Sequence, residues 1–241
     1  MSIWEFANPV RFMRLSGRLL PYFSVLTIVL LLSGLIWGFF FTPNERVQGA
    51  SVKILYVHVP LAFLAINVYF MMFVTSLIWL IRRHHVSALA AKAAAPIGAV
   101  FTLAALISGA LWGSTTWGTY WQWDPKLTSF LIMFIFYIGY IALWESVDEP
   151  DKAADLTSIL CLIGSVFAIL SRYAVNFWNQ GIHQGASLSI DKEENVSDVY
   201  WQPLMLVMAG VFFLFLTLLF IRTRTEIRNR RIAALQARET S

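Results

Sequence analysis

The chain has 241 residues, of which 58% are hydrophobic and only 13% are charged. Soluble domains carry about 25% charged residues, so this composition excludes an ordinary water-soluble protein and indicates an integral membrane protein. The formal net charge is +4, the single cysteine Cys161 lies within an apolar run, and no P-loop is present. The sequence therefore predicts neither a disulfide framework nor ATP hydrolysis by this chain, and we expect it not to be an enzyme.

Residues 1–20 form a basic amphipathic segment, in which aromatic side chains alternate with arginines. We expect this segment to lie on an anionic membrane surface. Six apolar runs follow, each long enough for a transmembrane helix, and they predict an all-α fold with a single polytopic membrane domain over 1–241. The predicted spans are about 21–41, 54–81, 93–111, 128–144, 156–173 and 203–221. The remaining residues, 222–241, form a basic tail that we expect to be helical.

An even number of spans places both termini on the same side of the membrane. Only five of the 18 lysines and arginines fall on the opposite side, namely Arg46, Lys53, Lys126, Arg172 and Lys192. This bias predicts cytoplasmic termini, because cytoplasmic loops are enriched in positive charge. We therefore expect a multi-pass protein of the bacterial inner membrane, with the loops at 112–129 and 174–201 on the periplasmic face.

The stretch 112–129, with the sequence WGSTTWGTYWQWDPKLTS, has the most distinctive composition in the chain. It holds four of the ten tryptophans, which are Trp112, Trp117, Trp121 and Trp123. Aromatic faces beside glycines and a few charges suit a large, flat, apolar ligand with polar edges. An interfacial aromatic belt is the alternative interpretation. Asp124 precedes a proline and is predicted to cap the fourth span, while Lys126 extends its charge to the interface.

Two of the four histidines, His58 and His183, lie on the predicted periplasmic side and flank the tryptophan stretch in sequence. Neutral imidazole is the usual nitrogen ligand of haem iron. Either histidine alone is more often structural, but the two together on one face favour ligation of haem from both sides. The haem propionates require cations, and Arg46, Lys53, Lys126 and Arg172 are equally eligible. The other two, His84 and His85, are expected to cap a helix on the cytoplasmic side.

The segment WGTYWQWDPKLTS resembles the tryptophan-rich signature of the haem-handling proteins of cytochrome c maturation. Six spans, the segment VQGASVKILYVHVP that leads into the second span, and a single outer histidine after the fifth are similar to the haem exporter protein C (CcmC) family in particular. The resemblance extends over essentially the whole chain.

This resemblance implies that His58 and His183 are the axial ligands of haem b. It also implies that Trp117, Trp121, Trp123 and Asp124 belong to a platform that holds haem at the periplasmic face. Lys126 stands where we expect arginine more often, which keeps the charge but loses bidentate contact with a propionate. The implied partners are the periplasmic haem chaperone CcmE, the small membrane protein CcmD, the permease CcmB, the ATPase CcmA and membrane lipid, without nucleic acid.

Two other functions fit the composition. The chain could be the permease subunit of an ABC exporter, with histidines that are structural. It could also be a transmembrane electron carrier of the cytochrome b type, but such a protein needs histidine pairs stacked across the bilayer, and His58 has no deep partner in the sequence.

Overall fold

The computed structural model describes residues 8–177 and 196–239, so His183 lies outside the described residues. Six long helices account for most of the described chain: α1 (Pro9–Ile36), α2 (Leu55–Arg82), α3 (His85–Thr116), α4 (Pro125–Ser146), α5 (Pro150–Phe177) and α6 (Asp198–Glu239). Two short helical turns, η2 (Trp37–Phe41) and η3 (Ala50–Ile54), lie between α1 and α2. All six long helices are long and apolar enough to cross a membrane, which confirms the predicted all-helical, six-span class.

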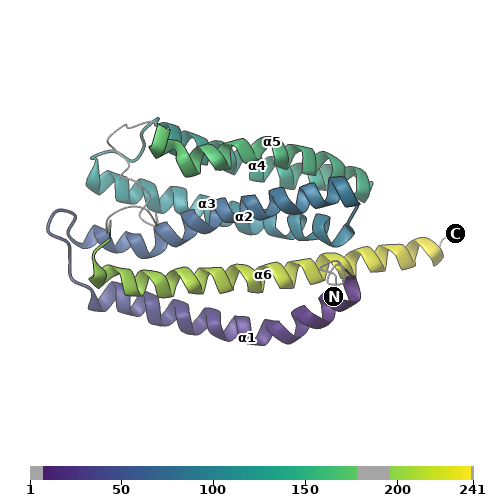
Figure 1. Ribbon diagram of the computed structural model, residues 1–241, viewed down its shortest axis with the longest axis horizontal. Helices are drawn as coiled ribbons and strands as arrows, with labels where there is room; N and C mark the ends of the chain where they lie inside the picture. The colour runs from purple at the N-terminus through teal and green to yellow at the C-terminus, as the bar shows by residue number, and fades with distance from the viewer. Residues whose placement is uncertain (1–7, 178–195, 240–241) are drawn as a thin grey trace.

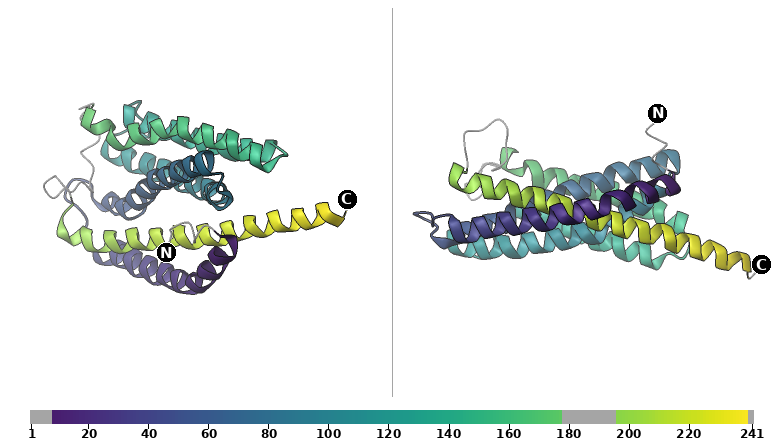
Figure 2. Two further views of the ribbon diagram at one scale, coloured as in Figure 1. Left: turned by 45° about the vertical axis from the view of Figure 1, so that its right-hand side comes forward. Right: turned by 90° about the horizontal axis from the view of Figure 1, so that it is seen from below.

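The helices pack in three layers, with α1 and α6 on one side, α2 and α3 in the middle, and α4 and α5 on the far side (Figure 1). The helix pairs α2–α3, α3–α4, α4–α5 and α2–α5 are in contact, so these four helices form a closed bundle. The first and last helices pair with each other along one flank of it (Figure 2). We call the end of the molecule with residues 42–54 and 117–124 the tryptophan end, and the opposite end, where α1 begins and α6 ends, the terminal end.

The helices extend beyond the hydrophobic runs that predict them at several boundaries. α1 begins at Pro9, where the Asn8 side chain accepts a hydrogen bond from the Val10 amide, so most of the predicted interfacial segment is continuous with the first span. Pro21 lies inside α1, and the helix bends in its N-terminal part (Figure 1). α3 continues to Thr116, so only 117–124 of the predicted 112–129 loop is non-helical. The basic tail is helical as far as Glu239, as predicted.

The interior of the α2–α5 bundle is filled by large side chains. Those with at most 2% exposure include Tyr69, Met72, Met133, Tyr137 and Tyr140. The rings of Tyr69 and Tyr137 meet edge to face at 4.9 Å, and the Tyr137 hydroxyl donates to the Ala65 carbonyl over 2.8 Å. A buried polar tip with a hydrogen-bond partner is compatible with a membrane interior. The bundle interior at mid-depth is therefore filled by packed side chains.

α6 makes polar contacts with three other helices near the terminal end. Arg222 Nε donates to the Ala93 carbonyl of α3 over 3.1 Å, and Arg224 Nη1 donates to the Ser16 hydroxyl of α1 over 3.0 Å. The Lys92 ammonium lies 3.0 Å from the Glu226 carboxylate, and the Arg230 guanidinium lies 2.6 Å from the carboxylate of Asp151 on α5. These hydrogen bonds and ion pairs hold the α1–α6 pair against the four-helix bundle.

Candidate functional site

His58 lies in the first turn of α2, at the tryptophan end, with its ring against α3. Its Nδ1 is 3.0 Å from the Ala105 carbonyl oxygen and 3.3 Å from the Ser108 hydroxyl. A carbonyl oxygen only accepts, so the short contact assigns the ring proton to Nδ1. The lone pair is then on Nε2, which is the form of imidazole that ligates a metal.

The close approach of His58 to α3 depends on a glycine. A Cβ placed on Gly109 would lie 2.7 Å from Cε1 of the His58 ring, closer than real Cβ contacts allow. One turn further along α3, the indole of Trp112 meets the imidazole edge to face at 5.9 Å. The ring of His58 is therefore held by a backbone carbonyl, a glycine surface and an aromatic neighbour, all from α3.

Trp112 is held in turn by the loop between α1 and α2. Its indole Nε1 donates to the Gln48 side-chain oxygen over 2.8 Å. Gln48 lies in a tight turn in which Glu45 and Gly49 exchange two backbone hydrogen bonds of 3.1 and 2.9 Å. The Glu45 carboxylate accepts hydrogen bonds from the Val47 and Gln48 amides, both at 2.7 Å, and these bonds lower its pKa. Gly49, with φ of +59°, has the backbone conformation that the turn requires.

The non-helical part of the tryptophan stretch is a short connection that ends on a capped helix. Trp117 ends α3 by donating its amide to the Gly113 carbonyl, and Gly118 follows with φ of +73°. Asp124, which is 5% exposed, accepts a hydrogen bond of 2.6 Å from the Leu127 amide and is the predicted cap of α4. The indoles of Trp121 and Trp123 stand edge to face at 5.5 Å between these two points.

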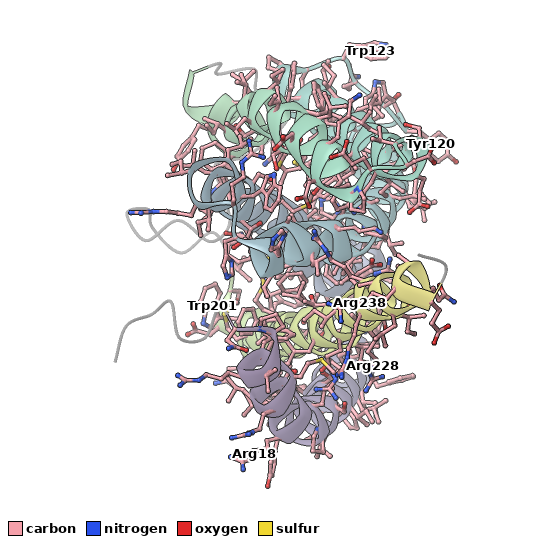
Figure 3. The ribbon with its side chains drawn as sticks, turned by 90° about the vertical axis from the view of Figure 1, so that its right-hand side faces the viewer. Arg18, Tyr120, Trp123, Trp201, Arg228 and Arg238 are labelled. Atoms are coloured by element: carbon pink, nitrogen blue, oxygen red, sulfur yellow. The ribbon has the colours of Figure 1, made fainter. Side chains whose placement is uncertain are left out.

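Trp121 and Trp123 border an open groove of about 400 Å³ between α3 and α4. All its lining side chains are apolar or aromatic, and they are Leu106, Ile107, Ala110, Trp121, Trp123 and Leu131. Trp123 is 77% exposed and lies at the margin of the molecule that is farthest from Arg18 of α1 (Figure 3). A volume of this size is within the range of sites for small molecules.

The groove and His58 lie on different sides of α3. The α3 residues that contact the His58 ring are Ala105, Ser108, Gly109 and Trp112, whereas the groove is lined by Leu106, Ile107 and Ala110. An α-helix turns by about 100° per residue, so the centres of the two sets are separated by roughly 150° around the helix axis. The described residues thus bring His58 and Trp112 together but place Trp121 and Trp123 across α3 from them.

The four candidate propionate partners are no longer equivalent in the structure. Lys53 Nζ donates to the Phe39 carbonyl over 2.7 Å, so this ammonium caps the helical turn that follows α1. Arg46 is exposed at the tip of the 45–49 turn. Lys126 at the start of α4 interacts electrostatically with Arg172 near the end of α5, and with Asp124. Two cations from neighbouring helices therefore share one region at the tryptophan end.

The two histidines predicted to lie on the cytoplasmic side are at the terminal end. His84 caps α3 by accepting a hydrogen bond of 3.2 Å from the Ser87 amide, and His85 packs against the Trp79 ring. Within 8–177 and 196–239, no three His, Cys, Asp or Glu side chains cluster in a way that could hold a metal ion. A ligand set with one imidazole suits haem better than a bare ion, because the porphyrin supplies the other four nitrogens.

Comparison with known proteins identifies the family. The family model for heme exporter protein C matches residues 2–238. The chain belongs to the heme exporter protein C family. Proteins named heme exporter protein C in Rhodobacter capsulatus and Paracoccus denitrificans are 68% and 67% identical, in each case over 99% of both chains. The protein of that name in Escherichia coli K12 is 38% identical over 94% of this chain and 91% of its own.

Membership of the heme exporter protein C family confirms the resemblance drawn from the tryptophan stretch and the two outer histidines. It does not reveal the residues that contact His58, namely Ala105, Ser108 and Gly109, or Gln48, which accepts a hydrogen bond from Trp112, and the sequence analysis missed all four. One signal was present, because Ala105, Ser108 and Gly109 are small residues at spacings of three and four, as expected where another side chain lies close to a helix. Nothing in the sequence pairs Gln48 with Trp112.

Proposed function

We propose that this protein binds haem at the tryptophan end and presents it to a periplasmic acceptor during cytochrome c maturation. The observation that carries the proposal is His58, whose Nδ1 proton is directed to the Ala105 carbonyl in a chain of the heme exporter protein C family. An imidazole held in one orientation at a helix end is suited to bind iron, because the carbonyl contact fixes the ring orientation and makes Nε2 more basic. His183 is the proposed second axial ligand and lies outside the described residues.

The cations support a specific orientation of the bound haem. Lys126 and Arg172 interact electrostatically as like charges, and Asp124 beside Lys126 offsets only one of the two positive charges, so this region can accept a further anion. A haem propionate is such an anion, and we propose that this pair receives it. Arg46 is left at the solvent side, where it can meet the second propionate or an acidic surface of the acceptor. Trp112 would cover the porphyrin near His58, and a platform role for Trp117, Trp121 and Trp123 stays a prediction.

The protein performs no bond-making chemistry of its own in this proposal. It holds haem until the chaperone CcmE takes it, and release requires at least one histidine to leave the iron. Bis-histidine ligation is firm, so a conformational change driven by the ATPase CcmA with the permease CcmB, in a complex that includes CcmD, is a suitable trigger. The packed core of the α2–α5 bundle supports a loading site rather than a conduit through this chain. The charge bias supports an inner-membrane location with cytoplasmic termini.

The absorption spectrum of the purified full-length protein tests the proposal. We expect a low-spin haem spectrum in the unmodified protein and its loss in His58→Ala and in His183→Ala. His85→Ala is the matched control, because this histidine lies at the terminal end and should leave the spectrum unchanged. A protein that lacks haem, or haem that is indifferent to both outer histidines, would return the ABC permease interpretation to first place.

A further inference from the structure

We propose that the exposed face of α2 is the docking site for one membrane-spanning helix of another subunit of the exporter. A hydrogen bond to Asn67, at the middle of the bilayer, would hold that helix in place. The inference rests on membership of a multi-subunit complex and does not depend on haem binding by His58. Haem binding and docking give different signals, so either can fail without the other.

Asn67 is an unusual residue for its position. It has the only side-chain amide within the six predicted spans. It lies roughly 18 Å from the first residue of α2 and roughly 22 Å from the last, at about 1.5 Å per residue. Since the hydrocarbon core of a bilayer is about 30 Å thick, Asn67 lies near its middle.

The carboxamide of Asn67 is exposed and only partly satisfied. Its Nδ2 donates to the Phe63 carbonyl over 2.7 Å, a bond within α2 itself. Within 8–177 and 196–239, no other residue donates to its Oδ1 or accepts its second N–H. Hydrocarbon offers no hydrogen bonds, so a polar side chain at this depth normally faces another helix and bonds to it. Asn67 therefore marks a helix contact that this chain alone does not complete.

The side chains above and below Asn67 form a seam for one helix. Spacings of four and three separate its members, which are Phe63, Asn67, Phe70, Val74, Leu77 and Ile81. Val74, Leu77 and Ile81 are 52%, 37% and 66% exposed, on the side of α2 that α3, α5 and α6 leave open. This alternation is the heptad pattern on which a second helix packs along its length. The seam is roughly 27 Å long, nearly the thickness of the hydrocarbon core.

Lipid and a second copy of this chain are the alternative occupants of the seam. Acyl chains fit its apolar side chains but give Asn67 no hydrogen-bond partner. A second copy would place Asn67 against itself, but membership of a haem exporter complex favours a different subunit. That subunit needs one spanning helix with a hydrogen-bonding side chain near its midpoint. CcmB and CcmD are the membrane subunits of the proposed complex.

Photo-cross-linking in the complex tests the proposal. The full-length protein is co-expressed with CcmA, CcmB and CcmD, and p-benzoylphenylalanine replaces either Val74 of the seam or Val100 of α3. Both valines are exposed on spanning helices, at 52% and 63%. We expect an adduct from position 74 to a spanning helix of CcmB or CcmD that has a polar residue near its midpoint. The adduct from position 100 should be several-fold weaker.

Asn67→Leu separates the hydrogen bond from the fold. It removes the amide at an exposed position, so the isolated protein should keep its melting temperature and its haem absorbance. We expect its affinity for the cross-linked subunit, measured by titration in detergent micelles, to fall by about 3- to 30-fold. This is the range for one hydrogen bond between spanning helices. Val100→Leu is the matched control and should leave the affinity unchanged.

Three results would overturn the proposal. Adducts from position 74 with lipid alone would make the seam ordinary lipid-facing surface. Adducts with a second copy of the chain would make it a contact between copies. An unchanged affinity in Asn67→Leu would show that the amide does not hold the partner. An unmodified protein that lacks haem but forms the adduct to CcmB or CcmD would contradict the haem proposal and leave the docking site in place.

Discussion

The His58 ring lies close to α3 because Gly109 has no side chain. A Cβ at this position would lie 2.7 Å from the imidazole carbon, so either the ring or α3 must move. We expect Gly109→Ala to destabilise the protein by about 1–3 kcal/mol, as overpacking does, and to alter the spectrum of bound haem. Gly139→Ala is the control, because its Cβ would lie 3.7 Å from Leu160, an ordinary contact.

Absorption spectra and thermal unfolding of the two alanine variants would separate positioning from general stability. The control should keep the unmodified spectrum. A normal spectrum in Gly109→Ala, in a protein whose haem depends on His58, would show that the glycine does not position the ligand.

The turn at Glu45 predicts a pH dependence of the site. Its carboxylate accepts two backbone hydrogen bonds, so its folded-state pKa is lower than its ordinary value. The turn is therefore fully stabilised above the ordinary carboxyl pKa, and this stabilisation is lost as pH falls through the lowered value. Because Gln48 of this turn holds Trp112 beside His58, we expect an acid-induced change in the haem absorbance.

Glu45→Gln tests the assignment of this acid transition. The amide oxygen of glutamine accepts hydrogen bonds but does not titrate, so the variant should bind haem at neutral pH and lack the acid step. An acid step of the same size in Glu45→Gln would mean that another group causes it.

At the scale of helices, Lys92 joins α3, α6 and α4 at the terminal end. Its ammonium lies 3.0 Å from the Glu226 carboxylate and 5.2 Å from the ring centre of Trp144. The two ionic side chains are only 28% and 16% exposed. We expect Lys92→Met to destabilise the protein by about 1–3 kcal/mol, because it leaves a largely buried carboxylate without a partner.

A double variant separates the ion pair from packing. Combining Lys92→Met with Glu226→Leu removes both charges, and we expect thermal unfolding in detergent to recover most of the lost stability. A double variant as unstable as the sum of its single changes would show that the pair has no coupling energy.

The spanning helices could be predicted from sequence because apolar runs of this length have one physical solution in a bilayer. α2 begins within one residue of the predicted start, and the helical tail was expected. Their rotation about their own axes could not be predicted, since every face of α3 is largely apolar. The rotation of α3 about its axis is what turns Ala105 toward His58 and Ile107 toward the groove. The sequence predicted the tryptophan stretch as one loop because its residues are contiguous. In the structure Trp112 is helical, and it contacts different residues from Trp121.

For the molecule as a whole, the tyrosine-filled core predicts that its single cysteine is inert. Cys161 has no exposed surface and lies beside Tyr69 and Ser76 inside the bundle, so reagents do not reach its thiol in the native protein. We expect no reaction with a maleimide in the native protein and one equivalent after denaturation, as counted by mass spectrometry. Labelling of the native protein would mean that the bundle opens at mid-depth, and the argument against a conduit would then fail.

The pairing of the first and last helices has a consequence for biogenesis. α1 packs mainly against α6, so α1 is synthesised well before its main neighbour, which begins nearly 200 residues later. At about 5–20 residues per second, α1 waits in lipid for roughly 10 s or more before that contact can form. A product truncated before α6 would therefore expose the α6-facing side of α1, which includes Gly34 and Phe23, to membrane proteases.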